Sequence, residues 1–255
     1  MGFADLHVHT TYSIDGTCTV SGVLKQVADC TNLDVIAITD HDCITGALEA
    51  LDLAPKYGIE VIPGCEVSTA DGHLIALDIR KPIPAGRSLE ETVLRAAEQG
   101  GFCIAAHPMA RAANALSARA IRQALQNPNV RRALVGAEAL NLGLLFHSSN
   151  AKAAQLAREL SLATICSSDA HVFWMLGLAA TEFPGVTAAD LRRAIFARDT
   201  QVCVGQGFNG VKMATSWMTR FLLRRAGWVT WNAEPSSPLQ MGRLAHARVV
   251  AGAPR

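Results

Sequence analysis

The segment Phe3-Ala-Asp-Leu-His-Val-His9 begins as an apolar run and ends in two histidines. A short apolar run of this kind is typical of a buried β-strand. Side chains alternate along a strand with a period of two, so His7 and His9 lie on the same face and can bind one ion. The pair is a weak signal on its own, because a structural histidine explains it as readily. Other parts of the sequence are needed to distinguish a metal-binding pair from structural histidines.

Six more runs of the same kind follow, and amphipathic segments separate most of them. Alternating β and α segments of this length imply parallel strands joined by right-handed crossovers. Seven strands that are almost continuously apolar favour a closed barrel over an open sheet, so the expected fold class is an α/β barrel. The expected strands are Phe3–Val8, Val35–Thr39, Glu60–Pro63, Leu74–Ile79, Phe102–Ala106, Leu134–Leu140 and Ala163–Cys166.

Helix start signals precede the amphipathic segments. Ser88 and Glu91 have the spacing of a capping box, and the helix that they open is expected to end at Gly100–Gly101. The other expected helices are Gly46–Tyr57 after Thr45, Ala151–Leu160 after Asn150, and the segment from Thr187-x-x-Asp190 to about Arg198.

One connection is too short for a helical crossover. Six residues separate Glu66 from His73, and they include the tight-turn dipeptide Asp71-Gly72. We therefore expect Glu66–Ile79 to form a hairpin, which makes the barrel irregular at this point.

The pattern changes after Gly205. Residues 1–205 are expected to form the barrel, and residues 206–255 a short C-terminal helical extension and tail. Val211–Arg225 is a basic helical stretch, expected to pack on the barrel with its charges on the solvated face. Glu234–Pro238 is a turn-rich break before a loosely ordered tail.

Composition limits the classes of function. Of the 255 residues, 50% are hydrophobic and 18% are charged, and the formal net charge is +1, so the chain is globular and has no strong field for nucleic acid or a membrane. The seven cysteines are scattered, which indicates reduced thiols, and Cys65, Cys103 and Cys166 lie in apolar runs. No apolar run reaches the roughly 18 residues of a membrane span. The charged segment Asp5–His9 leaves no room for a signal peptide. We expect a cytoplasmic protein without a membrane or nucleic-acid partner, and the oligomeric state stays open.

Six of the eight histidines lie within or beside the end of an expected strand, and carboxylates accompany most of them. The carboxyl ends of the strands of a βα barrel meet at one face, where these side chains would converge. Imidazole and carboxylate together suit Zn, Mn or Fe. Burying so many of them costs several kcal/mol each unless cations compensate, and their number exceeds the coordination of one ion, so we expect two or three divalent metal ions. The groups are His7, His9, His41, His73, His107 and His171 with Asp5, Asp15, Asp40, Asp42, Glu66 and Asp169.

These residues resemble the motifs of the PHP (polymerase and histidinol phosphatase) family of metal-dependent phosphoesterases, whose fold is a distorted (β/α)7 barrel. The resemblance covers about residues 1–185, and Asp71-Gly-His-Leu-Ile-Ala-Leu77 is similar to the stand-alone, small-molecule branch of the family. Several members of that branch act on nucleotides, including 3′,5′-bisphosphates. The matching segments are Asp5-Leu-His-Val-His-Thr-Thr-Tyr-Ser-Ile-Asp15, Ile38-Thr-Asp-His-Asp42, Ile62-Pro-Gly-Cys-Glu-Val-Ser68, Ala106-His-Pro108 and Ser168-Asp-Ala-His171.

The resemblance implies a set of metal ligands. One ion would be held by His7, His9, Glu66 and Asp169. A second would share Glu66 and use His107, with His73 of the hairpin in place of a histidine that relatives carry on the next strand. A third would be held by Asp15, His41 and His171, although relatives often have histidine where this chain has Asp15.

The resemblance also implies a hydrolase that attacks a phosphate ester with a metal-bridged hydroxide. His171 or Asp40 is the expected general acid. Arg111 is the first choice for the residue that binds the phosphate, with Arg87 second, and His147 is expected to line the pocket. The expected substrate is a small nucleotide-like phosphate ester, with the choice between monoester and diester left open.

Two other functions compete with this one. The first is metal-dependent C–N hydrolysis, which similar barrels perform with similar metals. The second is a non-catalytic metal-binding regulatory or nucleic-acid-binding module. Its basic surface would consist of Lys212, Arg220, Arg224 and Arg225.

Overall fold

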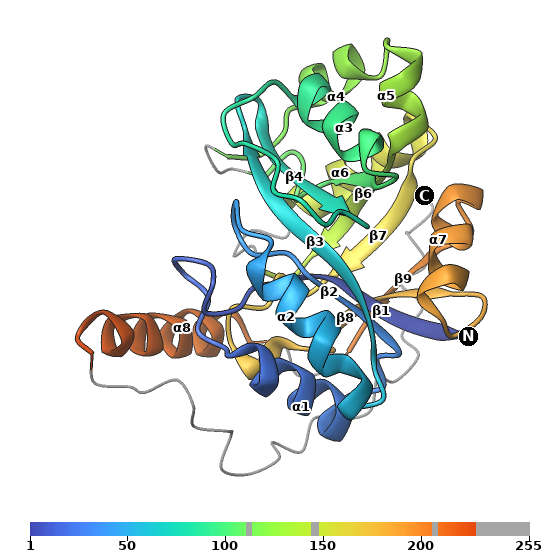
Figure 1. Ribbon diagram of the computed structural model, residues 1–255. Coiled ribbons are helices and arrows are strands. Elements are labelled where there is room, and N and C mark those ends of the chain that lie inside the picture. Colours follow the sequence, from blue (N-terminus) through green and yellow to red (C-terminus); the bar gives the residue numbers. More distant parts are fainter. Residues whose placement is uncertain (111–113, 144–147, 206–208, 228–255) are drawn as a thin grey trace, which may run out of the picture.

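A computed structural model describes residues 1–110, 114–143, 148–205 and 209–227 of the chain. Within these residues, one sheet of nine strands, in the order β7-β6-β5-β4-β3-β2-β1-β8-β9, curls into a nearly closed barrel with helices around it (Figure 1). The strands are β1 (Gly2–Val8), β2 (Val35–Ile38), β3 (Glu60–Thr69), β4 (Gly72–Leu77), β5 (Phe102–Ala105), β6 (Leu134–Asn141), β7 (Ala163–Ser167), β8 (Ala179–Phe183) and β9 (Gln201–Val204).

The expected α/β barrel is confirmed, and each of the seven expected strands is present. The strands β8 and β9 were not expected, because their short segments lack the long apolar runs of the others. Both pair antiparallel: β8 with β1, and β9 with β8. They extend the sheet past β1 on the side where the barrel closes.

The expected hairpin is also confirmed. The strands β3 and β4 pair antiparallel, with Glu66 opposite Ile75 and Ser68 opposite His73. The strand β4 is antiparallel to β5 as well, so it runs against both of its neighbours. This reversed strand is what makes the barrel irregular.

The barrel closes between the ends of β7 and β1. Backbone hydrogen bonds join Ala170 to both histidines of the first strand: Ala170 N donates to His7 O (3.2 Å), and His9 N donates to Ala170 O (3.0 Å). Below them, the buried carboxylate of Asp5 accepts from the backbone N and the hydroxyl of Ser168 at 3.0 and 2.5 Å. The closure therefore lies directly beside the residues expected to bind metal.

The helices begin where capping residues stand. Ser88 accepts from Glu91 N at the start of α3, and Thr187 and Asp190 form a complete capping box at the start of α7. Thr45 is not a cap: it is the first residue of α2, and Ile44 precedes the helix without a side-chain bond. The helices are α1 (Val20–Cys30), α2 (Thr45–Leu53), α3 (Leu89–Glu98), α4 (Ala118–Ala124), α5 (Pro128–Ala133), α6 (Ser148–Glu159), α7 (Ala188–Ala197) and α8 (Gly210–Arg225), with short 3-10 turns at Ala54–Lys56 and Phe173–Met175.

Two apolar layers stabilise the fold. One lies between the sheet and the surrounding helices and includes the buried residues of α1, which recur at the three- and four-residue spacing of an amphipathic helix. The other fills the barrel with strand residues such as Leu6, Phe102 and Ile165, and it includes Leu191 and Ile195 of α7. Since α7 contacts β3, β6, β7 and β8, which lie on different sides of the barrel, it closes the end at which the parallel strands begin.

This arrangement predicts that truncating the buried face of α7 destabilises the whole barrel. Leu191→Ala should lower the free energy of unfolding by about 2–5 kcal/mol, because Leu191 is fully buried in the barrel core. The matched control is Val186→Ala, just before the helix on a side chain that is 55% exposed, where we expect a change below about 0.5 kcal/mol. Urea unfolding of both variants measures the difference, and equal stabilities would show that α7 does not complete the core.

Candidate metal centre

The nine residues expected to bind metal come together at one end of the barrel. They lie on β1, β3 and β4 or in the segments that follow β1, β2, β5 and β7. Their imidazole rings are close neighbours, with centroid distances of 4.2 Å between His9 and His171 and 5.0 Å between His41 and His73. All nine are buried or partly buried.

Glu66 lies at the middle of the group, and its carboxylate is 1% exposed. Its Oε1 is 2.8 Å from His73 Nδ1 and 2.9 Å from His107 Nε2. The distances from its Oε2 to three more imidazole nitrogens are 3.1 Å to His7 Nε2, 3.3 Å to His9 Nε2 and 3.0 Å to His41 Nδ1. One carboxylate therefore faces five imidazoles.

The remaining two carboxylates face these imidazoles from either side. Asp169 Oδ1 is 3.5 Å from His7 Nε2 and 3.3 Å from His9 Nε2. Asp15 Oδ2 is 3.4 Å from His41 Nε2 and 3.3 Å from His171 Nε2. Three groups have ligand atoms that all lie within 4.8 Å of one another: His7, His9 and Glu66; His41, Glu66 and His73; and His9, Asp15, His41 and His171.

Several buried polar atoms at this end have no hydrogen-bond partner among the described residues, and Glu66 Oε2 lies 3.0 to 3.3 Å from three of them, His7 Nε2, His9 Nε2 and His41 Nδ1. Leaving such atoms unsatisfied costs about 1–3 kcal/mol each, and a cation between these three nitrogens and the carboxylates would satisfy them. The donor set of imidazole nitrogens and carboxylate oxygens is the one that Zn, Mn and Fe accept. The residues therefore fit divalent metal ions. The atoms are His7 Nε2, His9 Nε2, Asp15 Oδ1, His41 Nδ1 and His107 Nδ1.

The second nitrogen of several of these histidines is held in place. His7 Nδ1 is 2.9 Å from Glu138 Oε1, and His9 Nδ1 is 2.9 Å from the hydroxyl of Ser13. His171 Nδ1 is 2.9 Å from the carbonyl of Asp169. Such partners fix the tautomer and the orientation of a ligating imidazole.

Glu138 and Asn114 are functional candidates that sequence reasoning missed. Glu138 is fully buried, and its Oε2 accepts from His107 N (2.6 Å) and from Asn141 Nδ2 (2.9 Å). Since its Oε1 also contacts His7, Glu138 orients two expected ligands, His7 and His107. A single glutamate inside an otherwise apolar strand was the available signal. The carbonyl of Asn114 accepts from His73 N (2.8 Å), and nothing in the local sequence indicates this contact.

The other expected site residues have different positions. Asp40 is fully buried and accepts from Thr10 N (2.6 Å), Thr10 Oγ1 (2.7 Å) and Ser13 N (3.2 Å), so both of its oxygens hold the segment after β1. These contacts give no support to a role as general acid. Arg87 is exposed beside Glu91, with Nη1–Oε1 at 3.7 Å. Arg111 and His147 lie outside the described residues.

The backbone is irregular around the centre. The strand β1 carries one extra residue between Asp5 and Val8 relative to β2, which makes a bulge. The neighbours Leu6 and His7 therefore both face the inside of the barrel: Leu6 lies in the apolar core, and His7 contacts Glu66. Asp169 has a φ of 53°, in the left-handed region that non-glycine residues rarely adopt. A Cβ at Gly143 would lie 2.7 Å from the Cβ of Asp169, so only glycine fits there.

Neighbouring opposite charges shift the pKa values of the carboxylates in the centre. Burial by itself would raise the pKa of Glu66, but the charge of His7 and the hydrogen bond with His107 hold it well below its usual range. The pKa values of Asp169 and Asp15 are lowered in the same way, against burial, by His7 and by His171 respectively.

The pKa values of His7, His41, His107 and His171 shift in the opposite direction. Burial would lower the pKa of His171, but its contacts with Asp15 and Asp169 raise that pKa to about 9. The pKa of His7 is likewise raised well above its usual value by Asp169, Glu66 and Glu138, against burial. The neighbouring carboxylates therefore favour the imidazolium forms of His7 and His171 in the metal-free centre.

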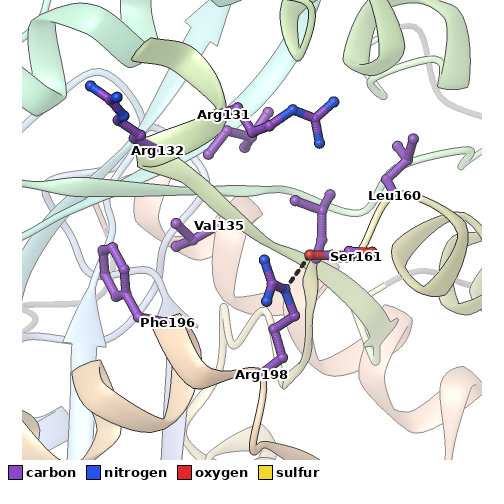
Figure 2. A pocket seen from close by; sticks show the side chains of 9 residues that line it. Arg131, Arg132, Val135, Leu160, Ser161, Phe196 and Arg198 are labelled. Carbon is purple, nitrogen blue, oxygen red and sulfur yellow. Dashed lines mark hydrogen bonds between the residues drawn. The ribbon is translucent and has the colours of Figure 1, made fainter. Parts of the chain in front are cut away.

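An open pocket of about 390 Å³ lies at the other end of the barrel, where β6 and β7 begin (Figure 2). Arg131, Arg132, Arg198 and Phe196 line it. The three arginines are exposed, and Arg198 Nε donates to the carbonyl of Ser161 at 2.5 Å. The pocket lies at the opposite end of these strands from Glu138 and Asp169, so it is no part of the metal centre.

Comparisons with known proteins agree with this geometry. Residues 5–103 match the family described as PHP domain, and residues 147–200 match the one described as PHP-associated. An uncharacterised protein of Methanocaldococcus jannaschii is 40% identical over 126 residues, which are 46% of this chain and 73% of that protein. A 3′,5′-nucleoside bisphosphate phosphatase of Chromobacterium violaceum is 35% identical over 114 residues, which are 42% of this chain and 39% of that enzyme.

A solved structure shares the fold. It is a two-domain protein of Bacteroides vulgatus that contains a predicted PHP-like metal-dependent phosphoesterase, with a TM-score of 0.65 at 18% sequence identity. The match covers 86% of this chain and 68% of that one. No helix in the described part of the chain is long and apolar enough to cross a membrane.

The charge pairing predicts how the metal-free protein responds to pH. The raised pKa values of His7, His41, His107 and His171 give stability that is complete below the ordinary histidine value and is lost as pH rises through the raised values. The free energy of unfolding of metal-free protein should therefore fall between about pH 6.5 and 9, by roughly 3 kcal/mol from His171 alone.

Metal-loaded protein should show the reverse trend, because ligation requires neutral imidazoles and higher pH strengthens binding. Urea unfolding of both forms across this pH range makes the comparison. A metal-free protein whose stability is constant from pH 6.5 to 9 would contradict the charge pairing.

A second prediction concerns Glu138. Glu138→Gln retains the shape of the side chain but removes the charge that orients His7, so metal affinity should fall about 10- to 100-fold. Glu182→Gln, on β8 at the end of the sheet where β1 begins, is the matched control and should bind metal like the wild type. Isothermal titration with Mn²⁺ measures both, and equal affinities would remove Glu138 from the centre.

Proposed function

The chain belongs to the PHP domain family, and from that membership we propose that it hydrolyses small phosphate esters with two or three divalent metal ions. The observation that carries the proposal is the environment of Glu66, where one buried carboxylate faces five imidazoles. Several of the surrounding polar atoms lack a hydrogen-bond partner in the part of the chain that the structure describes. Neither a structural core nor a solvated surface needs such a group. The alternative of a non-catalytic module has less support, because the set of ligands is complete.

The proposed ligands follow the contacts. His7, His9, Glu66 and Asp169 would hold one ion, and Glu66 with His73 and His107 a second. Asp15, His41 and His171 would hold a third, with His9 also within reach. Bound divalent ions lower the pKa of water toward neutrality and polarise phosphoryl oxygens, which are the two needs of phosphate-ester hydrolysis.

Neighbouring residues orient the imidazole rings of the proposed ligands. Glu138 accepts from Nδ1 of His7, and Ser13 contacts Nδ1 of His9, so Nε2 of each ring faces Glu66 and Asp169. Both nitrogens of His171 have partners, the carbonyl of Asp169 and the carboxylate of Asp15. We therefore favour a ligand role for His171 over that of general acid.

The proposed substrate is a small nucleotide-like phosphate ester. The 3′,5′-nucleoside bisphosphate phosphatase relative supports a nucleotide, although the match spans less than half of either chain. In the described residues between Glu66 and Asp169, all helices and strands belong to the barrel and its outer layer, and they form no separate recognition domain. The loops that connect these elements can enclose one nucleotide, but they offer no extended basic track for a polynucleotide.

Metal-dependent C–N hydrolysis is the other enzymatic candidate. No observation favours this reaction over phosphate-ester hydrolysis.

The test combines metal analysis with a substrate panel. Protein loaded with Mn²⁺ should release phosphate from a nucleoside 3′,5′-bisphosphate with a kcat/KM at least about 100-fold above that for an oligonucleotide. Glu66→Gln should lose metal and at least about 100-fold in activity. Glu60→Gln, on the same strand but at its other end, should change neither.

Two outcomes would contradict the proposal in different ways. Full activity of Glu66→Gln would exclude the metal mechanism. Equal turnover of the oligonucleotide would leave that mechanism intact but show that the active site accepts polynucleotides.

A further inference from the structure

The helix α8 lies over the segment that carries Asp15. We call residues 10–18, between β1 and α1, the Asp15 loop. Arg224 of α8 donates from Nη2 to Thr11 O (2.8 Å) and from Nη1 to Ser13 O (2.9 Å), and its Nη1 also bonds Gly16 O. Trp217 Nε1 donates to the carbonyl of Asp15 itself at 3.0 Å. Two side chains of one helix thus hold the backbone on both sides of a proposed metal ligand.

These contacts come from a single face of α8. Met213, Trp217, Arg220 and Arg224 recur at three- and four-residue spacing, which places them on one side of the helix. Met213 is buried in the core, and the guanidinium of Arg220 lies 5.9 Å from the centre of the Phe173 ring. The opposite face is exposed at Val211, Met218 and Leu222. Figure 1 shows α8 on the other side of the barrel from α7.

The sequence-based expectation for this helix is therefore only half correct. The helix packs on the barrel, as expected, but Arg224 does not lie on a solvated face. Among the described residues it has no carboxylate partner, and its guanidinium is used on backbone carbonyls. Hydrogen bonds from a charged donor are about twice as strong as neutral ones, and the planar fork of arginine can serve several acceptors at once.

The middle of the Asp15 loop depends on these donors. Its two ends are held from within the barrel: Asp40 accepts from Thr10 and Ser13, and Thr17 N donates to His171 O at 3.2 Å. Among the described residues, the backbone groups of Ile14, Asp15 and Gly16 have hydrogen bonds only from Arg224 and Trp217. At the tip, the side chain of Ile14 is 79% exposed.

We propose that Arg224, together with Trp217, is a positioning residue for the third metal site, the one formed by Asp15, His41 and His171. It fixes the backbone of the Asp15 loop so that the carboxylate of Asp15 meets the two imidazoles. This inference rests on the proposed multinuclear centre. It makes the binding of one particular ion depend on the C-terminal helix, while the ions around Glu66 are held by the barrel alone.

The test is a Mn²⁺ titration of metal-free protein by isothermal titration calorimetry, with elemental analysis of the product. Wild type should bind three equivalents. Arg224→Gln should bind the third about 10- to 100-fold more weakly, with the affinity for the first two and the melting temperature of the metal-free protein unchanged. Arg225→Gln is the matched control: this guanidinium is one residue along, exposed and 5.7 Å from the Phe221 ring, and the variant should match wild type.

A second variant tests the same point without changing charge. Trp217→Phe retains an aromatic ring beside Phe221 but removes the N–H that donates to Asp15 O, so it should weaken the same third equivalent to a smaller degree. An Arg224→Gln protein with unchanged third-site affinity would overturn the proposal. So would equal weakening of all three equivalents with a lower melting temperature, since that outcome indicates general destabilisation.

The outcomes separate this inference from the proposed function. A wild type that binds only two equivalents overturns the positioning role and leaves two-ion phosphoesterase chemistry standing. A wild type that binds three equivalents, but releases phosphate from no ester of the panel, contradicts the proposed function. The Arg224→Gln titration then still decides the positioning role.

Discussion

The structure depends on the burial of one carboxylate, that of Glu66, among five imidazoles. An isolated carboxylate in a barrel would take up a proton, because burial disfavours its charged form. Here the surrounding charges outweigh burial, so the pKa of Glu66 stays low while the pKa values of His7, His41 and His107 rise. The compensation requires residues from five strands and their following segments to meet at one point. The irregular features of the barrel are the means by which they do so.

Several of those irregularities lie beside the proposed metal centre. The bulge in β1, the reversed strand β4 and the left-handed backbone of Asp169 all lie beside the centre, and β6 has a second bulge between Glu138 and Leu140. Apolar side chains fill the other end, and α7 closes it. Bulges and left-handed residues destabilise a sheet locally, and they persist where the surroundings determine them. In this barrel, the apolar end closed by α7 provides the stability that the polar end with the proposed ligands requires.

Sequence reasoning could recover the parts that depend on local pattern. The seven strands and the hairpin at Asp71-Gly72 follow from apolar runs and turn residues. Polar residues at strand ends indicate a wider group of histidines and carboxylates, and the resemblance to a known family selects from it the nine proposed ligands. Sequence reasoning missed contacts that only the tertiary structure creates. In the sequence, Glu138 is a single polar residue in an apolar strand. Its contact partner His7 lies 131 residues away along the chain. In the sequence, Arg224 is one of several basic residues on an exposed helix. Its contact partners in the Asp15 loop lie more than 200 residues away along the chain. Periodicity gives no information on pairings of this kind.

Asp15 differs from the other expected ligands in where it is attached. His7, Glu66 and His73 lie within strands, and His9, His41, His107, Asp169 and His171 lie within a few residues of a strand end, so the sheet fixes them directly. Asp15 is seven residues beyond the end of β1, on a loop with an exposed tip. A ligand at that distance needs support that the sheet does not give, because every ordered loop residue costs roughly 1–2 kcal/mol of conformational entropy. Asp40 supports the loop from the barrel side and α8 from the outer side. In the proposed arrangement, a carboxylate on a loop joins a centre built on strands because the barrel holds the loop from one side and a C-terminal helix holds it from the other.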